Sequence, residues 1–434
     1  MINMNTIHPP QSDRFRETQI NRTLKHSMLL QPTEEEEANH ELKIASQGDS
    51  KDSIVEHFTP ILCAPCNPPS SPTSDSDPPG LSLEDDHIAE QETHPKSEME
   101  CQSNKHTFVV LADSQLGMTS LNVEWETELH YCRMAVDRIN ALQPRPRFVC
   151  VCGDIVDMES SFYYNNPKAL KKYGLEDCER IQQEQFYDFK QVFSNLHPDI
   201  ATVCLCGNHD VGNRPTPQSI EKFRDAFGDE YLAFWVNGTY NIALNNVLFI
   251  NPEGAEDMFT KQLEWLQDRL EYANRHEASQ IYVFGHHPWF LYSDEEDFDD
   301  FSPNIGSPFP PEWDDGSGRF DNAIFPDSYF SMPKQYRQKA MELFKEYRVN
   351  ACFSGHFHQN LVSKSSFGMD MIVTGPLSMV FDSSGKSDQP ERNEKGRGIR
   401  VVEVEASVPV DGMDSKRRTG AGGGSFTHHF ECLE

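Results

Sequence analysis

Apolar runs rich in β-branched and aromatic residues recur along the chain from Phe108 onward, and this feature constrains the fold more than any other. Runs that are nearly continuous, rather than alternating with polar residues, are typical of strands buried on both faces. A sheet built from them must be covered on each side by another layer. The predicted strands are 108–112, 147–152, 201–206, 246–250, 281–285, 350–354, 371–374 and 399–404.

Segments with helical periodicity lie between several of these runs. Within 122–142, apolar residues recur at the spacing of one helix face, and two further helices are predicted around 259–270 and over 334–348. Strands that alternate with helices predict an α/β fold with layered α–β–α architecture. The apolar face of the first helix consists of Trp125, Leu129, Cys132, Val136 and Ile139.

Polar residues follow directly after five of the predicted strands. In α/β sheets, ligands bind just outside the carboxyl ends of the strands, so clusters at five such ends can converge on one point. A single Gly-Asp or a lone histidine at a strand end is usually a turn residue, whereas five clusters in order predict a site. The clusters are Asp113-Ser114-Gln115, Gly153-Asp154, Gly207-Asn208-His209-Asp210, Gly285-His286-His287 and Gly355-His356-Phe357-His358.

The side chains in these clusters are carboxylates, imidazoles and amides, without a thiolate. Such donors favour Mn²⁺, Fe or Zn²⁺ in open coordination that keeps a bound water. Two ions about 3.5–4 Å apart can each bind a phosphoryl oxygen and generate hydroxide at neutral pH, and a shared carboxylate is needed to hold them so close. The pattern therefore indicates a two-metal hydrolytic site.

The order of the clusters resembles the calcineurin-like metallophosphoesterase superfamily, whose pattern is D-x-H, G-D, G-N-H-D/E, G-H and G-H-x-H. The resemblance implies a four-layer α-β-β-α sandwich with the metal site at the carboxyl ends of strands and two divalent metal ions as cofactors. It implies that Asp154 bridges the ions, that Asp113 and His358 complete one site, and that the other site holds Asn208, His286 and His356.

Gln115 departs from the superfamily pattern, because it stands where the first motif normally has histidine. A glutamine carbonyl is a weaker neutral ligand than imidazole, so the first metal is expected to bind less tightly. The same glutamine occurs in a narrower animal group of the superfamily, classed as serine/threonine phosphatases. Resemblance to that group covers about residues 107–405, in ADSQLG, GNHDVGNRPT, EYLAFWVNG, HHPWFLYSDEED, SGHFHQN and GIRVVEV.

The resemblance also gives roles to three further residues, His209, Asp210 and His287. His209 is expected to be the general acid or the imidazole that orients phosphate, with Asp210 as the partner that fixes the ring and raises its pKa. The alternative for His209 is a helix-capping turn residue. His287 is expected to point away from its neighbour His286 and to lie at the rim. Arg214 is a candidate phosphate contact, with a solvated loop arginine as the alternative.

The implied activity is that of a phosphomonoesterase acting on phosphoserine or phosphothreonine, a serine/threonine-protein phosphatase. A phosphodiesterase or nucleotide hydrolase of the same superfamily is the main alternative within the enzyme class. An inactive, metal-poor scaffold for protein binding is the alternative from another class. The pair His209 and Asp210 favours the hydrolase, because a scaffold has no use for a proton donor beside the metals.

The charge balance limits the partners. The sequence holds 38 Lys+Arg against 69 Asp+Glu, a net charge of −31. This argues against nucleic acid or an anionic membrane as a partner, since both call for a basic surface. An acidic domain also repels phosphorylated substrates unless bound divalent cations invert the local field. Composition therefore fits a phosphoprotein substrate only together with metal ions.

The first 105 residues differ in amino-acid composition from the rest of the chain. They are acidic and rich in Ser and Pro, so they are predicted to be a disordered tail that offers a segment for protein partners. Residues 106–434 form the predicted metallophosphoesterase domain, with a loop insertion near 302–327. The chain has no apolar run long enough for a membrane helix and no signal-like start, which predicts a cytoplasmic protein without disulfides.

Overall fold

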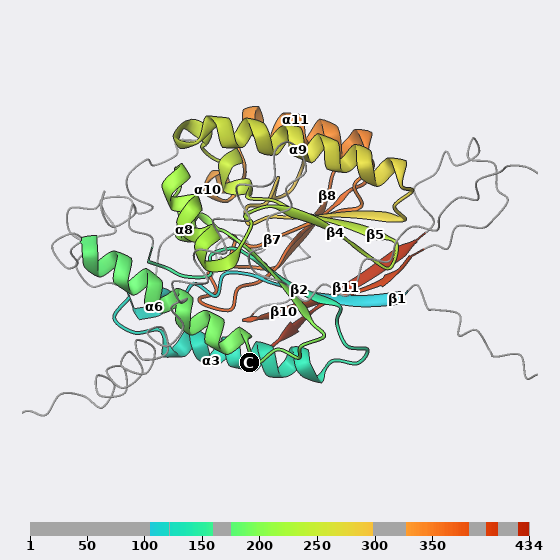
Figure 1. Cartoon of the computed structure of the whole chain (residues 1–434). Coiled ribbons are helices and arrows are strands. Elements are labelled where there is room, and N and C mark those ends of the chain that lie inside the picture. Colours follow the sequence, from blue (N-terminus) through green and yellow to red (C-terminus); the bar gives the residue numbers. More distant parts are fainter. Residues whose placement is uncertain are drawn as a thin grey trace, which may run out of the picture. The chain divides into compact units, whose positions relative to one another are not determined.

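Two β-sheets face each other in the computed structural model, which describes residues 105–120, 122–158, 175–297, 327–381, 396–406 and 424–433 (Figure 1). In the first sheet, β1, β2 and β3 are parallel, and β10 pairs with β1 in the antiparallel sense. The strand order is β11 (Ser425–Cys432), β10 (Gly398–Glu405), β1 (Lys105–Leu111), β2 (Phe148–Cys152) and β3 (Ala201–Leu205).

The second sheet has a parallel centre and antiparallel edges. Strands β5, β6, β7 and β9 run in the same direction, whereas β4 and β8 close the two sides. Parallel neighbours end at the same edge of the sheet, which brings the loops after β6 and β7 together. The order is β4 (Leu232–Val236), β5 (Thr239–Ala243), β6 (Gln280–Phe284), β7 (Ala351–Ser354), β9 (Asp370–Val373) and β8 (Leu361–Lys364).

Aromatic side chains fill the space between the sheets. Phe108 of β1 stacks on Phe148 of β2 with ring centroids 4.8 Å apart, and Phe284 of β6 stacks on Phe353 of β7 at 5.2 Å. The two pairs meet edge to face, with Phe108 and Phe284 at 5.7 Å. Because strand side chains alternate between faces, the neighbouring residues on these strands face outward, toward the helices.

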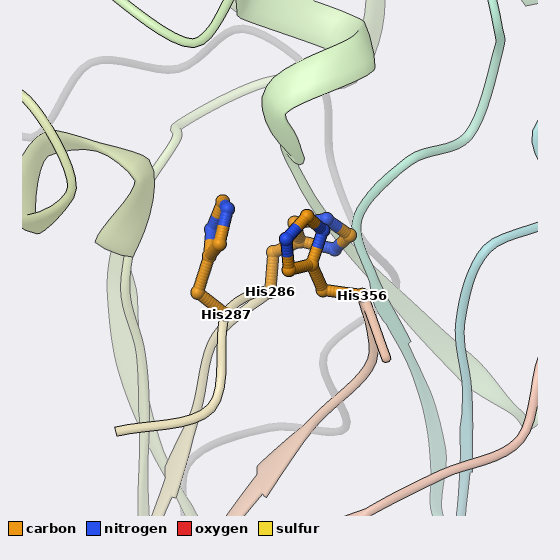
Figure 2. A group of neighbouring side chains, drawn as sticks. All are labelled: His286, His287 and His356. Atoms are coloured by element: carbon orange, nitrogen blue, oxygen red, sulfur yellow. The ribbon is translucent and has the colours of Figure 1, made fainter. Parts of the chain in front are cut away.

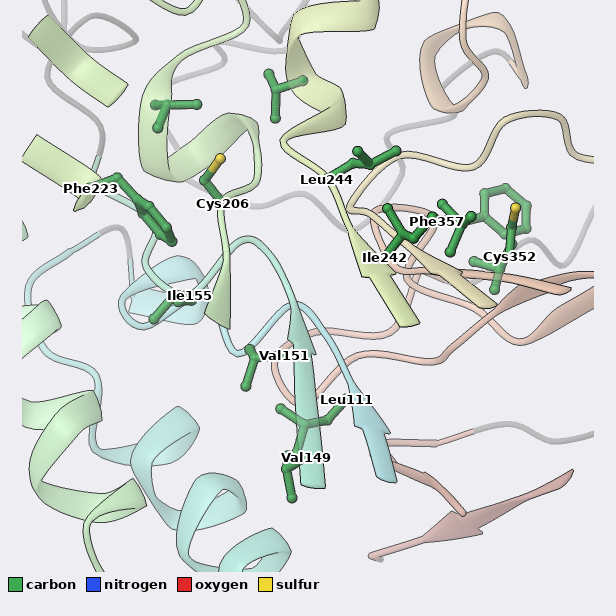
Figure 3. Packing of buried hydrophobic residues seen from close by; sticks show 14 of the residues in the cluster. Leu111, Val149, Val151, Ile155, Cys206, Phe223, Ile242, Leu244, Cys352 and Phe357 are labelled. Carbon is green, nitrogen blue, oxygen red and sulfur yellow. The ribbon is translucent and has the colours of Figure 1, made fainter. Parts of the chain in front are cut away.

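Helices cover the outer face of each sheet, α3 and α6 on the first and α9 and α11 on the second (Figure 1). Leu111, Val149 and Val151 belong to these outer layers (Figure 3). The predicted four-layer α-β-β-α sandwich is confirmed, and every residue of the predicted apolar face of α3 is buried. The covering helices are α3 (Glu126–Ala141), α6 (Leu175–Phe193), α9 (Glu256–Arg275) and α11 (Lys334–Glu346).

The prediction of a strand over 246–250 is wrong. Residues Asn246–Phe249 form a short 3-10 helix, η2, in which all four residues are buried. A short apolar run cannot be distinguished from a buried helical turn by periodicity alone. The remaining short elements are η1 (Met118–Ser120), α7 (Asn208–Val211), α8 (Pro217–Phe227), η3 (Pro252–Gly254) and α10 (Asp327–Phe330).

Several predictions concern residues outside the described ranges. These are residues 1–104 of the predicted tail and 302–326 of the predicted insertion. Among the described helices, none combines the length and apolar character needed to cross a membrane. None of the described cysteines forms a disulfide, and Cys150 and Cys152 are buried on one face of β2.

Candidate metal centre

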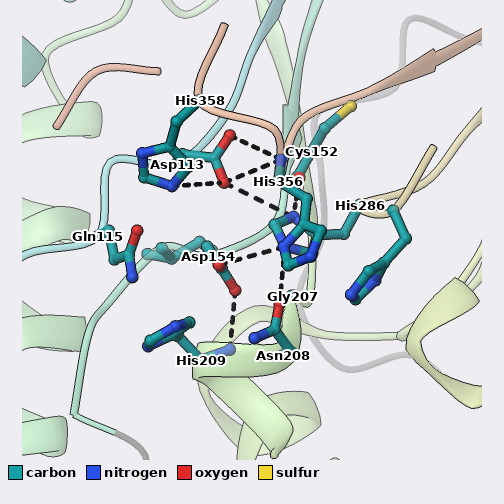
Figure 4. Close-up of polar contacts among 12 residues, drawn as sticks. Asp113, Gln115, Cys152, Asp154, Gly207, Asn208, His209, His286, His356 and His358 are labelled. Carbon is teal, nitrogen blue, oxygen red and sulfur yellow. Dashed lines mark hydrogen bonds and ion pairs between the residues drawn. The ribbon is translucent and has the colours of Figure 1, made fainter. Parts of the chain in front are cut away.

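The polar clusters after β1, β2, β3, β6 and β7 converge at one end of the two sheets (Figure 4). Hydrogen bonds join clusters that are far apart in sequence. The backbone N–H of His356 donates to the Asp113 carboxylate at 2.9 Å, and that of His209 donates to Asp154 Oδ1 at 2.8 Å. The structure therefore brings the seven predicted metal ligands together: Asp113, Gln115, Asp154, Asn208, His286, His356 and His358.

Five of these seven residues have backbones in the left-handed region. The φ angles are 52° for Asp113, 48° for Asp154 and 66° for His356. Gln115 and His358 have φ angles of 37° and 54°. Non-glycine residues in this region each cost about 1–3 kcal/mol and cluster at functional sites. The concentration of strain at these turns marks the strand ends as a site rather than as ordinary loops.

The loop after β3 approaches Asp154 so closely that it needs a glycine. A Cβ atom on Gly207 would overlap both Oδ1 and the backbone nitrogen of Asp154. The Asp210 carboxylate accepts hydrogen bonds from the N–H groups of Gly207 at 2.7 Å, Ile155 at 3.0 Å and Val156 at 3.2 Å. Asp210 therefore ties the two loops together. The prediction that it is the partner of the His209 ring is wrong.

The ring partner of His209 is Asp157. Nδ1 of His209 lies 3.2 Å from Asp157 Oδ1 and 3.3 Å from the Asp157 carbonyl oxygen. Burial lowers the pKa of His209, but the Asp154 charge and the Asp157 hydrogen bond outweigh it and raise that pKa to about 10. Sequence reasoning missed Asp157, although it follows Asp154 by three residues in the same turn.

Asp157 also orients Gln115. The Gln115 Nε2 group donates to Asp157 Oδ1 at 3.2 Å, and Asn122 Nδ2 donates to Asp157 Oδ2 at 2.6 Å. Gln185 of α6 holds Asn122 in turn, at 2.7 Å. Gln115 Oε1 is buried and has no hydrogen-bond donor among the described residues. A buried oxygen without a donor fits a metal ligand.

Three of the histidines have a backbone carbonyl on one ring nitrogen. His286 Nδ1 donates to Cys152 O at 2.8 Å, His356 Nε2 donates to Tyr329 O at 3.3 Å, and His358 Nδ1 donates to Met379 O. A carbonyl only accepts, so a proton lies on that nitrogen, and the other nitrogen is the one that can offer a lone pair to a metal ion. Metal-binding histidines are typically oriented in this way.

The buried carboxylates at the centre are also suited to bind cations. One ligand atom from each of Asp113, Asp154 and His286 lies within 4.8 Å of the others. His286 Nε2 is 3.2 Å from Asp154 Oδ2 and 3.1 Å from Asn208 Oδ1. Burial raises the pKa of Asp113 to about 8. Carboxylates are buried together in this way when they are paired or coordinate a metal.

The expectation that His287 lies at the rim is wrong. Its side chain is buried, and it points into the same region as His286 and His356 (Figure 2). Adjacent residues point in opposite directions only within a strand. Strand β6 ends at Phe284, and the irregular backbone after it lets both imidazoles face the centre. Burial lowers the pKa of His287 well below its usual range, which leaves the ring neutral.

Arg214 lies on the surface, half exposed. Its Nη2 atom is 3.6 Å from Glu253 Oε2, in an ion pair whose two side chains are about equally exposed. Exposed pairs of this kind contribute less than about 1 kcal/mol. The contact between Arg214 and phosphate stays a prediction.

The fold and the ligand arrangement define the class of the protein. The profile of the calcineurin-like phosphoesterase family matches residues 106–360, more than half of the chain. The chain therefore belongs to this family, and it is a metallophosphoesterase, a hydrolase.

The chain is also similar to individual known proteins. The chain is 29% identical to serine/threonine-protein phosphatase CPPED1 of Danio rerio, over 68% of this chain and 80% of that one. It is 30% identical to the protein of the same name in Bos taurus, over 69% and 80%. A dimetal phosphatase structure from Danio rerio matches with a TM-score of 0.42 and 12% identity, over 69% of this chain and 95% of that one. The narrower resemblance expected from the sequence motifs is confirmed.

Proposed function

We propose that this protein is a dinuclear metal-dependent phosphomonoesterase that acts as a serine/threonine-protein phosphatase. The observation that carries the proposal is the position of Asp154, which has ligand atoms of Asp113 and His286 within 4.8 Å and accepts the backbone N–H of His209. The names of the CPPED1 relatives support the substrate class. A phosphorylated protein is thus the proposed partner.

The two ligand sets share Asp154. Asp113, Gln115 and His358 would hold the first ion, and Asn208, His286 and His356 the second. Mn, Fe and Zn ions all suit these donors. Bound ions would supply a hydroxide nucleophile at neutral pH and would hold the phosphoryl oxygens.

His209 is placed to move a proton. Asp157 holds the Nδ1 side of the ring, so the mobile proton would be at Nε2. The Asp154 charge and the Asp157 contact together raise the pKa of His209, which favours the protonated imidazole. A protonated imidazole next to the phosphoryl group can give its proton to a leaving serine or threonine alkoxide.

Metal analysis of the purified chain, followed by turnover of p-nitrophenyl phosphate, tests the activity. We expect two divalent ions per chain and Mn²⁺-stimulated turnover. His209→Ala should lower kcat by about 10²–10⁴ while the metal content stays the same. His130→Ala, which changes an exposed histidine of α3, is the matched control. Absence of metal-stimulated turnover would instead favour the metal-poor scaffold.

A second comparison tests the substrate class. Under the same conditions, a phosphoserine peptide should be hydrolysed with a higher kcat/KM than bis(p-nitrophenyl) phosphate. A preference for the bis-ester would replace the phosphatase with a phosphodiesterase of the same family. A preference for a nucleotide over the peptide would replace it with a nucleotide hydrolase.

The location and the further partners belong to the same proposal. A cytoplasmic protein with no nucleic-acid or membrane partner agrees with the net charge of −31. The acidic segment 1–105 is the proposed contact for other proteins. Microscopy of the tagged full chain would test the location. Affinity capture with and without residues 1–105 would test the partners.

A further inference from the structure

His287 is a buried imidazole beside the second ligand set that the activity described so far does not use. Its side chain is 2% exposed. One ligand atom from each of His286, His287 and His356 lies within 4.8 Å of the others. The three rings extend from the ends of β6 and β7 toward one region (Figure 2). His287 and His356 are the nearest pair, with ring centroids 4.0 Å apart.

The backbone of His287 is held in place by one side chain. Asn246 Oδ1 accepts the N–H groups of His286 at 2.8 Å and His287 at 3.1 Å, and its Nδ2 donates to the His287 carbonyl at 2.8 Å. Asn246 itself is buried in η2. Two of these hydrogen bonds satisfy both the N–H and the carbonyl of His287. The backbone that carries the imidazole is therefore fixed, as the backbone of a ligand should be.

The ring of His287 differs from the other histidines of the centre in its hydrogen bonding. His286, His356 and His358 each donate one ring nitrogen to a backbone carbonyl. Nδ1 of His287 is buried, and no group among the described residues hydrogen-bonds it. A buried polar atom without a partner is unfavourable unless an ion or water satisfies it. An imidazole nitrogen in a cluster of imidazoles suits a cation.

We propose that His287 is a further ligand of the second ion, which would then be bound by His286, His287 and His356 together with Asn208 and the shared Asp154. This inference rests on the proposed function, because it needs the second ion. It adds one donor to the set that the family resemblance implies. It also gives the second site three imidazoles, whereas the first site has one.

A third imidazole should change which ion the second site prefers. Imidazole donors favour Zn²⁺ and Fe, whereas carboxylate and carbonyl donors favour Mn²⁺. Removal of His287 should therefore weaken Zn²⁺ binding more than Mn²⁺ binding. Loss of a mere packing residue would weaken both equally.

Metal titration of the full-length chain tests the proposal. Wild type, His287→Gln and His106→Gln are stripped with a chelator and titrated with Zn²⁺ alone, and then with Mn²⁺ alone. His106 is the matched control, because it is 4% exposed and its Nδ1 also lacks a partner among the described residues, but it lies near the amino end of β1.

We expect two Zn²⁺ ions to bind to wild type and to His106→Gln. In His287→Gln, the affinity of one of the two should fall at least about tenfold, with a smaller fall for Mn²⁺. Unchanged affinity for both ions in a folded His287→Gln would overturn the inference alone. Fewer than two ions in wild type would overturn the proposed function together with the inference.

If His287→Gln does not fold, a crystal structure of Zn²⁺-loaded wild type tests whether His287 binds the ion. A His287 nitrogen about 2.0–2.1 Å from zinc is the expected result. A His287 ring that contacts only protein atoms, or only a bound phosphate, would overturn the proposal. Hydrolytic activity is not part of this measurement, so the proposed reaction and the ligand are tested separately.

Discussion

The two halves of the proposed metal centre differ in the side chains that they would offer to a cation. The first half has the Asp113 carboxylate, the Gln115 amide and a single imidazole, that of His358. The second half has the Asn208 amide and a group of three imidazoles. Because imidazole is the stronger donor for ions such as Zn²⁺, the two halves should bind their ions with unequal affinity. The first half should be the weaker one.

Gln115 is oriented differently from the imidazoles of the centre. Side chains from other elements orient Gln115, through Asp157, Asn122 and Gln185 of α6. The imidazoles of His286, His356 and His358 are instead oriented by backbone carbonyls. A point substitution can remove a side-chain contact but not a carbonyl. Gln115 is therefore the residue of the first half whose orientation a neighbouring substitution can change.

The largest effect is expected from Asp154→Asn, which should weaken metal binding in both halves. Asp154→Asn takes away the carboxylate that the two ions would share. We expect the stoichiometry of bound metal to fall below two and kcat to fall at least about a thousandfold, since metal activation supplies several kcal/mol. Elemental analysis and p-nitrophenyl phosphate turnover measure this. Asp137→Asn, on the exposed side of α3, is the control. Full activity in Asp154→Asn would show that Asp154 is not shared.

A smaller effect, on metal binding in the first half alone, is expected from Asp157→Asn. Asp157→Asn removes the charge beside His209 and presents an amide N–H to Asn122 in place of an acceptor. We expect kcat to fall about 10–100-fold, and the first ion to bind more weakly while the second is unchanged. Metal titration resolves the two affinities. Asp199→Asn, at an exposed acid, should change neither. Equal weakening of both ions would show that Asp157 does not act through Gln115 alone.

The next change should make the halves more alike. Gln115→His restores the imidazole of the superfamily pattern, so the first ion should bind about tenfold more tightly. Gln115→Asn keeps an amide but shortens its reach, and it should weaken the same ion. Competition with a chromophoric chelator measures both variants. An unaltered first affinity in both would mean that residue 115 does not bind the ion.

The smallest effect is expected from a substitution of Arg214, which belongs to neither half. Arg214→Ala should raise the KM for a phosphopeptide less than about fivefold, because an exposed ion pair contributes below about 1 kcal/mol. Lys222→Ala, at another exposed pair, calibrates the assay. A much larger rise in KM, with kcat unchanged, would instead place Arg214 in contact with the substrate phosphate.

Most of the fold follows from local sequence patterns. Most of the buried strands, though not β5, and the apolar face of α3 could be predicted because side-chain periodicity is a property of neighbouring residues. The ligand positions at the strand ends could be predicted for the same reason, since each follows a strand directly. The segment at 246–250 could not, because a short buried apolar run is compatible with a strand or with a helical turn.

The sequence by itself predicted seven of the eleven described strands, three of the four covering helices and the identity of the expected ligands, but it missed β4, β5, β8, β11 and α6. Only the tertiary structure decided which residues support those ligands. Asn246 positions His286 and His287 across 40 and 41 residues, and Asp157 joins Gln115 to His209 across 42 and 52. Such contacts depend on loops from different strands meeting at one edge, which no local pattern encodes. His287 became a candidate ligand for this reason alone.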